Sequence, residues 1–159
     1  MTTTPVRIPG AVFDRDGHVM SERLRVAPGR DGAAPSAGDA RRVGDVRRSV
    51  PALLRQCGLE ALADDVTLIV SELLTNAVQH GGSPEIALEI AVTDGSLRIA
   101  VRDGVPGTGV PGRPEDTAET GRGLLLVDAL VREHGGAWGT GGDGAETWCR
   151  LPAPAGWRP

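Results

Sequence analysis

Two polar side chains stand out in the apolar helical segment at residues 68–82, which reads LIVSELLTNAVQHGG. Glu72 and Asn76 are four residues apart, so on a helix they share one face, with side-chain roots about 5–6 Å apart. An amide oxygen is a suitable ligand for Mg²⁺, which takes its other oxygens from water and phosphate groups. A carboxylate one turn away can order a metal-bound water or accept a proton from an attacking hydroxyl. An isolated pair of this kind is more often the polar edge of an amphipathic helix, so the spacing alone leaves both interpretations open.

A third polar residue, Asp103, ends a predicted strand at residues 96–103. The apolar side chains of Leu97, Ile99 and Val101 alternate with polar or small ones, and Asp103 continues the apolar set. Its carboxylate is therefore expected on the core side, where it needs a hydrogen-bond donor. The exocyclic amino group of a nucleobase would be such a donor. A simple Asp-Gly turn after the strand explains the residue equally well.

Two glycines open a predicted helix in the segment TGRGLLLV at residues 120–127. Gly121 and Gly123 allow close backbone approach, and the first N–H groups of a helix can hold a phosphate. Arg122 could add a charged contact. Glycine before a helix is also ordinary turn chemistry. The dinucleotide-binding fingerprint does not fit, because a third glycine and a preceding strand are missing.

Periodicity predicts the elements that must position these residues. Apolar residues at helical spacing predict helices from Asp39 to the stop at Gly58, with a kink or break at Pro51, and over residues 60–80. A helix is also expected over residues 121–136. Alternating residues predict strands, which are residues 21–27 (hairpinned with residues 11–13), 85–92, 96–103, 137–140 and 145–152. We expect an α/β (α+β) two-layer sandwich, with about three helices on one face of a mostly antiparallel, mixed sheet.

Composition excludes several classes of protein. The 159 residues include 17 basic ones, all of them arginine, and the net charge is −4. Without lysine there is no P-loop and no Schiff-base chemistry on this chain, and the negative charge argues against a nucleic-acid partner. No apolar run approaches the length of a membrane span and the first residues do not resemble a signal peptide, so we expect a cytoplasmic protein. The two cysteines, Cys57 and Cys149, are interpreted as small buried hydrophobes.

In order, these motifs resemble the GHKL ATPase superfamily of gyrase, heat-shock chaperone, histidine kinase and mismatch-repair ATPases. The stretches LIVSELLTNAVQHGG, VRDGVPG, ETGRGLLLVDAL and AETWCRLP look like the bacterial anti-sigma factor kinase group. The composition resembles that of single-domain members from high-GC actinobacteria. The resemblance covers about residues 39–152. It implies a histidine-kinase-like ATP-binding domain at 38–152, after an extension at 1–37 that holds a strand and a linker and before a tail at 153–159.

The resemblance also implies a role for each motif residue, with ATP and Mg²⁺ as cofactors. Glu72 matches the catalytic base, Asn76 the magnesium ligand and Asp103 the adenine-binding aspartate. The other nucleotide-binding positions are Gly107, Gly121, Arg122, Gly123, Leu124 and Thr147. Val105 replaces the first glycine of the family's D-x-G-x-G motif, which puts the affinity of the adenine pocket in question. The lid between Asp103 and Gly121 is short, and without lysine Arg113 or Arg122 would have to neutralise phosphate charge.

Three functions follow from the resemblance. The first is a serine/threonine kinase that phosphorylates an anti-sigma factor antagonist and binds a sigma factor, as a homodimer that contacts neither nucleic acid nor membrane. The second is a module that binds ATP or ADP and a protein partner without transferring phosphate. The third is the catalytic half of a split histidine kinase, which would need a separate protein to supply the phosphoacceptor histidine.

Overall fold

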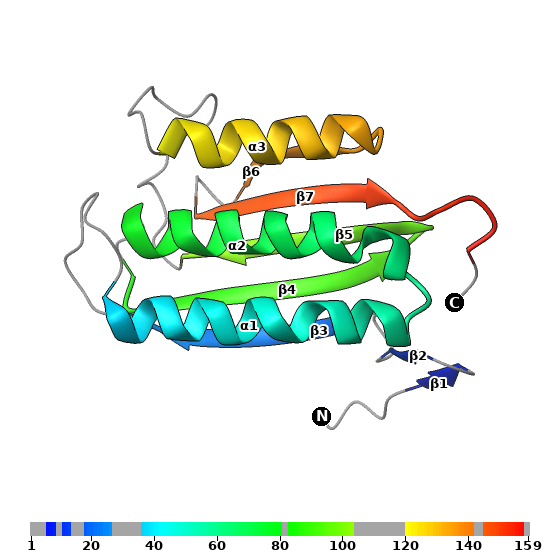
Figure 1. Ribbon diagram of the computed structural model, residues 1–159, viewed down its shortest axis with the longest axis horizontal. Helices are drawn as coiled ribbons and strands as arrows, with labels where there is room; N and C mark the ends of the chain where they lie inside the picture. Colours follow the sequence, from blue (N-terminus) through cyan, green and yellow to red (C-terminus); the bar gives the residue numbers. More distant parts are fainter. Residues whose placement is uncertain are drawn as a thin grey trace.

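The chain folds into two layers, with three helices packed on one face of a five-stranded sheet (Figure 1). The structure is a computed structural model that describes residues 6–8, 11–13, 18–26, 36–80, 83–103, 120–141 and 145–157. This arrangement confirms the expected fold. The strand pairings within the described ranges are all antiparallel, so the sheet shows no parallel pair where a mixed sheet was expected.

Helix α1 (Ala37–Gln56) begins two residues earlier than the periodicity predicted. Ser36 caps it, because its hydroxyl accepts a hydrogen bond of 3.1 Å from the backbone N–H of Asp39. The helix also continues through Pro51, where a kink or break was expected. Proline removes only one hydrogen bond of the helix, and the neighbouring Val50 and Leu54 are fully buried, so their packing holds the turn in place.

The chain reverses at Gly58, which has a φ of 73° and ends α1 as predicted. A short 3₁₀ turn, η1 (Glu60–Leu62), then leads into α2 (Ala63–His80). The apolar residues of α2 recur every three or four positions and form its buried face. Helix α3 (Thr120–Glu133) lies beside α2 and runs in the opposite direction (Figure 1).

The sheet has the strand order β3-β4-β5-β7-β6. Its strands are β3 (His18–Arg25), β4 (Glu85–Thr93), β5 (Ser96–Arg102), β6 (Ala137–Gly141) and β7 (Glu146–Pro152). The predicted hairpin between β4 and β5 is confirmed. Asp94 and Gly95 both have positive φ values, 51° and 73°, which is the geometry of the two-residue turn that joins twisted antiparallel strands.

The amino-terminal strands pair differently from the prediction. Residues 11–13 form β2 (Ala11–Phe13), which pairs with β1 (Val6–Ile8) in a separate two-stranded sheet. The expected hairpin partner of β2, the strand β3, instead pairs with β4 along seven register positions. Leu24 opposite Ile86 and Met20 opposite Ile90 explain this choice, because the pairing buries all four side chains against the helices.

The core lies between the two layers and consists almost entirely of aliphatic side chains. The side chains of Leu54, Ile69, Leu73, Ile86 and Ile99 are at most 2% exposed. Cys57 and Cys149 belong to this core, as predicted, and both are free thiols. Burial raises the pKa of the Cys149 thiol to about 12.

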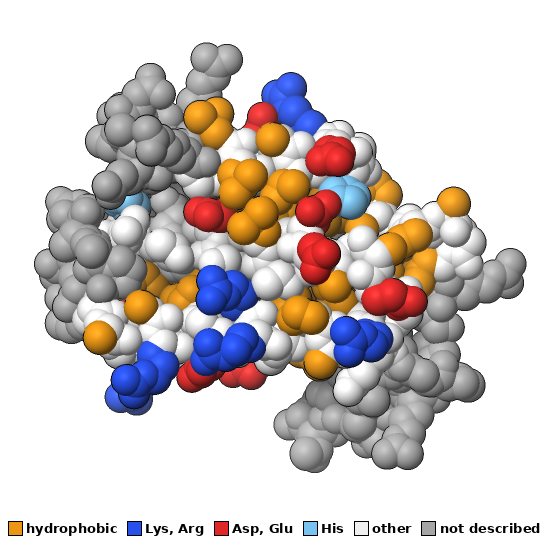
Figure 2. Space-filling view, in the orientation of Figure 1, with side chains coloured by type: hydrophobic (Ala, Val, Ile, Leu, Met, Phe, Trp, Pro, Cys, Tyr) orange, Lys and Arg blue, Asp and Glu red, His pale blue; other side chains and the backbone are white. Residues whose placement is uncertain are grey.

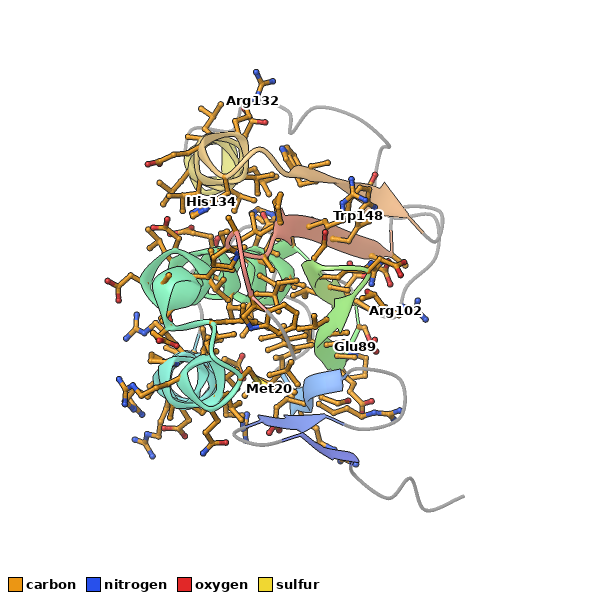
Figure 3. The ribbon with its side chains drawn as sticks, turned by 90° about the vertical axis from the view of Figure 1, so that its right-hand side faces the viewer. Met20, Glu89, Arg102, Arg132, His134 and Trp148 are labelled. Carbon is orange, nitrogen blue, oxygen red and sulfur yellow. The ribbon has the colours of Figure 1, made fainter. Side chains whose placement is uncertain are left out.

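The opposite face of the sheet carries charged side chains, and Arg102 and Glu89 point away from the helices there (Figure 3). Glu146 accepts hydrogen bonds from Arg98 (2.7 Å) and Arg102 (3.0 Å). Burial raises the pKa of the Glu146 carboxyl, but the two arginines outweigh that effect and hold the pKa below its ordinary value.

Trp157, the last residue that the structure describes, contacts the carboxyl end of α1. The indole N–H of Trp157 donates a hydrogen bond of 3.0 Å to the backbone oxygen of Cys57, and the ring packs beside Gly58. Within the described part of the chain, no helix has the length and apolar character needed to cross a membrane.

Candidate functional site

The predicted site residues lie near the ends of two helices and two strands, which meet at one side of the molecule. The carboxyl ends of α2 and β5 lie there, together with the amino ends of α3 and β7 (Figure 1). The antiparallel pairing of β5 with β7 and the opposite directions of α2 and α3 produce this convergence. Segments that are up to about 75 residues apart in sequence can therefore contribute to one site.

Asn76 on α2 carries an unusual buried oxygen. Its side-chain Oδ1 is inaccessible to solvent and has no hydrogen-bond partner among the described residues. A buried acceptor without a donor costs about 1–3 kcal/mol. Such a cost suggests a ligand, and an amide oxygen is suited to Mg²⁺. The residue present therefore fits the ion that the sequence motif implied.

Glu72, one turn before Asn76, lies directly against the first turn of α3. A Cβ atom placed on Gly123 would be 2.7 Å from Oε2 of Glu72 and 3.7 Å from its Cδ. The structure thus brings together two residues that are 51 positions apart in sequence and that belong to different motifs. Leu124, the next residue, is partly buried and packs against the core.

Asp103 and Thr147 are neighbours on the sheet. The backbone N–H of Asp103 donates to the carbonyl oxygen of Ala145 at 2.9 Å, so the β5–β7 pairing continues one residue past β5. Thr147 is paired with Val101, which is 3% exposed, and residues two apart on a strand share a face. Asp103 and Thr147 therefore share the helix-covered face of the sheet, and both are half-buried.

The remaining predicted positions are described less fully. Gly121 and Arg122 belong to the first turn of α3. Gly107 lies outside the described residues. The same is true of Val105, which replaces the first glycine of the motif, and of Arg113, which was expected to neutralise phosphate charge. The described residues also contain no group of three or more His, Cys, Asp or Glu side chains that could hold a metal ion. A magnesium ion at Asn76 would thus need oxygens from a nucleotide and from water.

The site lies at one end of a helical surface with an uneven charge distribution. Arginine side chains gather over α1, whereas hydrophobic and acidic side chains lie over α2 and α3 (Figure 2). Three of the α1 arginines (Arg41, Arg48 and Arg55) are seven residues apart and exposed, so they follow one stripe. This arginine stripe lies on α1, whereas Glu72 lies on α2 against the start of α3, where the helix end carries partial positive charge.

Two contacts that support α3 could not be predicted from the sequence. His134, just after α3, pairs with Asp65 near the start of α2 at 2.6 Å, and it lies between the two helices in Figure 3. Trp138 on β6 donates a hydrogen bond of 2.8 Å to Asp128 on α3. That bond and the ion pair with Arg132 outweigh desolvation and lower the pKa of the Asp128 carboxyl. His134 and Asp65 are 69 residues apart, and no spacing rule connects them.

Comparison with known proteins identifies similar domains. The family model described as histidine kinase-like ATPase domain matches residues 37–151. A Mycobacterium tuberculosis protein named sensor histidine kinase component HK1 is 37% identical over 106 residues, which are 57% of this chain and 62% of that protein. The Bacillus subtilis sensor histidine kinase LnrJ is 34% identical over 67 residues, which are 42% of this chain and 15% of that protein.

Among solved structures, the chain is similar to the histidine kinase domain of a blue-light activated histidine kinase from Erythrobacter litoralis. The TM-score is 0.49 at 22% sequence identity, over 80% of this chain and 66% of that one. The chain spans less than two thirds of the length of each of these proteins.

Proposed function

Because this chain belongs to the family of histidine kinase-like ATPase domains, we propose that it binds ATP with Mg²⁺ and transfers the terminal phosphoryl group to a protein. The buried, unpaired Oδ1 of Asn76 carries this proposal. A magnesium ligand at this point would relieve the cost of the buried oxygen, and the ion would supply positive charge that neutralises phosphate oxygens.

The residues of the chain take distinct roles in this proposal. The carboxylate of Asp103 and the hydroxyl of Thr147 accept and donate hydrogen bonds at the edge of the adenine. The N–H groups in the first turn of α3, from Gly121 to Leu124, hold phosphate oxygens and the charge that develops on them during transfer. Arg122 adds positive charge at the same turn.

Glu72 acts as general base in this scheme. A serine hydroxyl is a weak nucleophile, and a carboxylate within hydrogen-bond reach accepts its proton as the oxygen attacks phosphorus. The ADP oxygen leaves with the electron pair of the bond that breaks, and the phosphoryl group passes to the hydroxyl. The contact with α3 places Glu72 beside the turn proposed to hold the phosphates.

We propose as acceptor a serine or threonine of an anti-sigma factor antagonist, with a sigma factor as second partner and a homodimer as the working form. This part of the proposal rests on the motif resemblance at residues 39–152. The binding module without transfer is less well supported, because a protein that only binds nucleotide has no use for a carboxylate at position 72.

A second acceptor chemistry is supported by the names of the relatives, which are sensor histidine kinases. In that case the chain would be the catalytic component of a histidine kinase, and another protein would supply the phosphoacceptor histidine. A neutral imidazole attacks through its own lone pair. Glu72 would then orient the ring and would not need to remove a proton before attack.

One experiment tests transfer and separates these acceptors. The protein, or its Glu72→Gln variant, is incubated with Mg²⁺, γ-labelled ATP and either a candidate antagonist or a histidine-containing phosphotransfer protein. Label that is stable to hot acid and falls by about 10²–10⁴-fold in Glu72→Gln supports the serine/threonine kinase. Label that is lost in acid and stable in alkali supports the histidine kinase component. Nucleotide binding without label on either acceptor supports the binding module, and absence of ATP binding refutes all three.

A further inference from the structure

Gly123 touches Glu72 so closely that a side chain at position 123 has no room. The distance of 2.7 Å from a Cβ on Gly123 to Oε2 of Glu72 is under 3.0 Å, which real Cβ atoms essentially never show. The other close atoms are the Cδ (3.7 Å) and Cβ (4.0 Å) of the same glutamate. The carboxylate of Glu72 therefore fills the space that any other residue at position 123 would need.

Backbone conformation does not explain this glycine. The described glycines with positive φ are Gly58, Gly95, Gly135 and Gly156, whereas Gly123 lies within α3. A glycine inside a helix costs about 0.5–1 kcal/mol relative to alanine. Something at position 123 must offset that cost, and the contact with Glu72 is the feature of the structure that an alanine would remove.

We propose that Gly123 is a positioning residue for the catalytic base. Its missing side chain lets the Glu72 carboxylate lie against the first turn of α3, where the partial positive charge of the helix end stabilises it. The side chain of Glu72 is then confined to one orientation, facing the site of transfer. This inference rests on the proposed function, because it takes Glu72 as the base, and it assigns Gly123 a role separate from contact with phosphate.

The test substitution is Gly123→Ala. The atom that the new Cβ would meet is the far end of a flexible side chain, so the carboxylate moves aside while the helix gains a better helix former. We expect an unchanged or slightly raised Tm. We expect kcat to fall by about 10–100-fold, since small misplacements of a reacting group have effects of that size.

Two further variants make the result specific. Gly44→Ala is the matched control, because Gly44 is also within a helix and the atom nearest to its new Cβ would be Nη1 of Arg48, at 3.4 Å. It should leave kcat unchanged. Glu72→Asp shortens the base by one methylene, so in the double variant with Gly123→Ala it makes room for the new Cβ. The combined loss of kcat should be at least tenfold smaller than the product of the two single losses.

Several outcomes would overturn the inference while leaving the proposed function intact. These are wild-type kcat in Gly123→Ala, a loss that appears only as weaker ATP binding, or losses that simply multiply in the double variant. If Gly123→Ala does not fold but the double variant with Glu72→Asp does, the contact between the two residues is supported. If neither variant folds, the glycine is required by the backbone and the inference is wrong. A wild-type protein that binds ATP and transfers nothing overturns the proposed function, and the role of Gly123 with it.

Discussion

Replacing Asn76 by leucine should make the nucleotide-free protein more stable while removing its affinity for ATP with Mg²⁺. Leucine has a shape similar to that of asparagine but no polar atoms, so the substitution deletes a buried acceptor that lacks a donor. Deleting such a group recovers about 1–3 kcal/mol of unfolding free energy. For a chain of this size each kcal/mol corresponds to about 2–4 °C, so Tm should rise by about 2–12 °C.

The nucleotide should reverse this order of stability. A ligand at 100 times its dissociation constant adds about 2.7 kcal/mol to the stability of a protein that binds it. Wild type should gain this stabilisation from ATP with Mg²⁺, and Asn76→Leu should not. Urea unfolding should therefore show the variant as the more stable protein without nucleotide and wild type as the more stable protein with it. Gln79→Leu, at a half-buried position on the same helix, is the control and should keep the response to nucleotide.

Two results would refute this reasoning. Destabilisation of the nucleotide-free Asn76→Leu protein by more than about 1 kcal/mol would mean that the amide makes hydrogen bonds that hold the fold. A full nucleotide response in the variant would mean that Asn76 is not part of the site. The first result would remove the observation on which the magnesium proposal depends, and the second would remove the proposal itself.

Further predictions concern the fold. Trp157→Phe should lower the unfolding free energy by about 0.5–1.5 kcal/mol in urea titrations, because it deletes one hydrogen bond to Cys57; an unchanged value would mean that the tail does not hold α1. Glu146→Gln should destabilise by up to about 1 kcal/mol at pH 7, since the arginine partners are partly exposed. The lowered pKa means that this contribution is present above about pH 4.5 and is lost as the pH falls below it, so the two unfolding free energies should converge in acid. Cys149, with its pKa raised to about 12, should not react with a thiol reagent at pH 8 until the protein unfolds, and rapid labelling of the native protein would contradict its burial.

Periodicity predicted the three α-helices and the five strands of the main sheet, but it did not predict β1, the 3₁₀ turn η1 or every strand pairing. The stripe on α2 and the alternation on β4 and β5 are strong local signals, and both are confirmed. The pairing of β3 with β4 instead of β2 depends on which arrangement buries Met20 and Leu24, and that is a property of the assembled core. Pro51 illustrates the same limit, because packing of its neighbours outweighs a local helix-breaking preference.

The site was predictable by residue type but not by contact. The spacing of Glu72 and Asn76 indicated a shared face, yet only the assembled helices show that Oδ1 of Asn76 has no donor. Gly123 was predicted as a phosphate-binding glycine, whereas the structure adds its contact with Glu72. Such facts depend on how α2 and α3 lie against each other, which no sequence pattern specifies. The nucleotide-binding roles remain predictions.

The contacts that hold the carboxyl-terminal half of α3 determine which part of the helix moves most when it tilts. His134 joins the carboxyl end of this helix to α2, and Asp128 joins its last two turns to β6. Gly123 is 11 residues before His134, about 16 Å away along the axis, so a rotation of about 10° about the fastened end would move it by about 3 Å. A tilt of α3 about His134 would therefore move the first turn, which contacts Glu72, more than any other part of the helix.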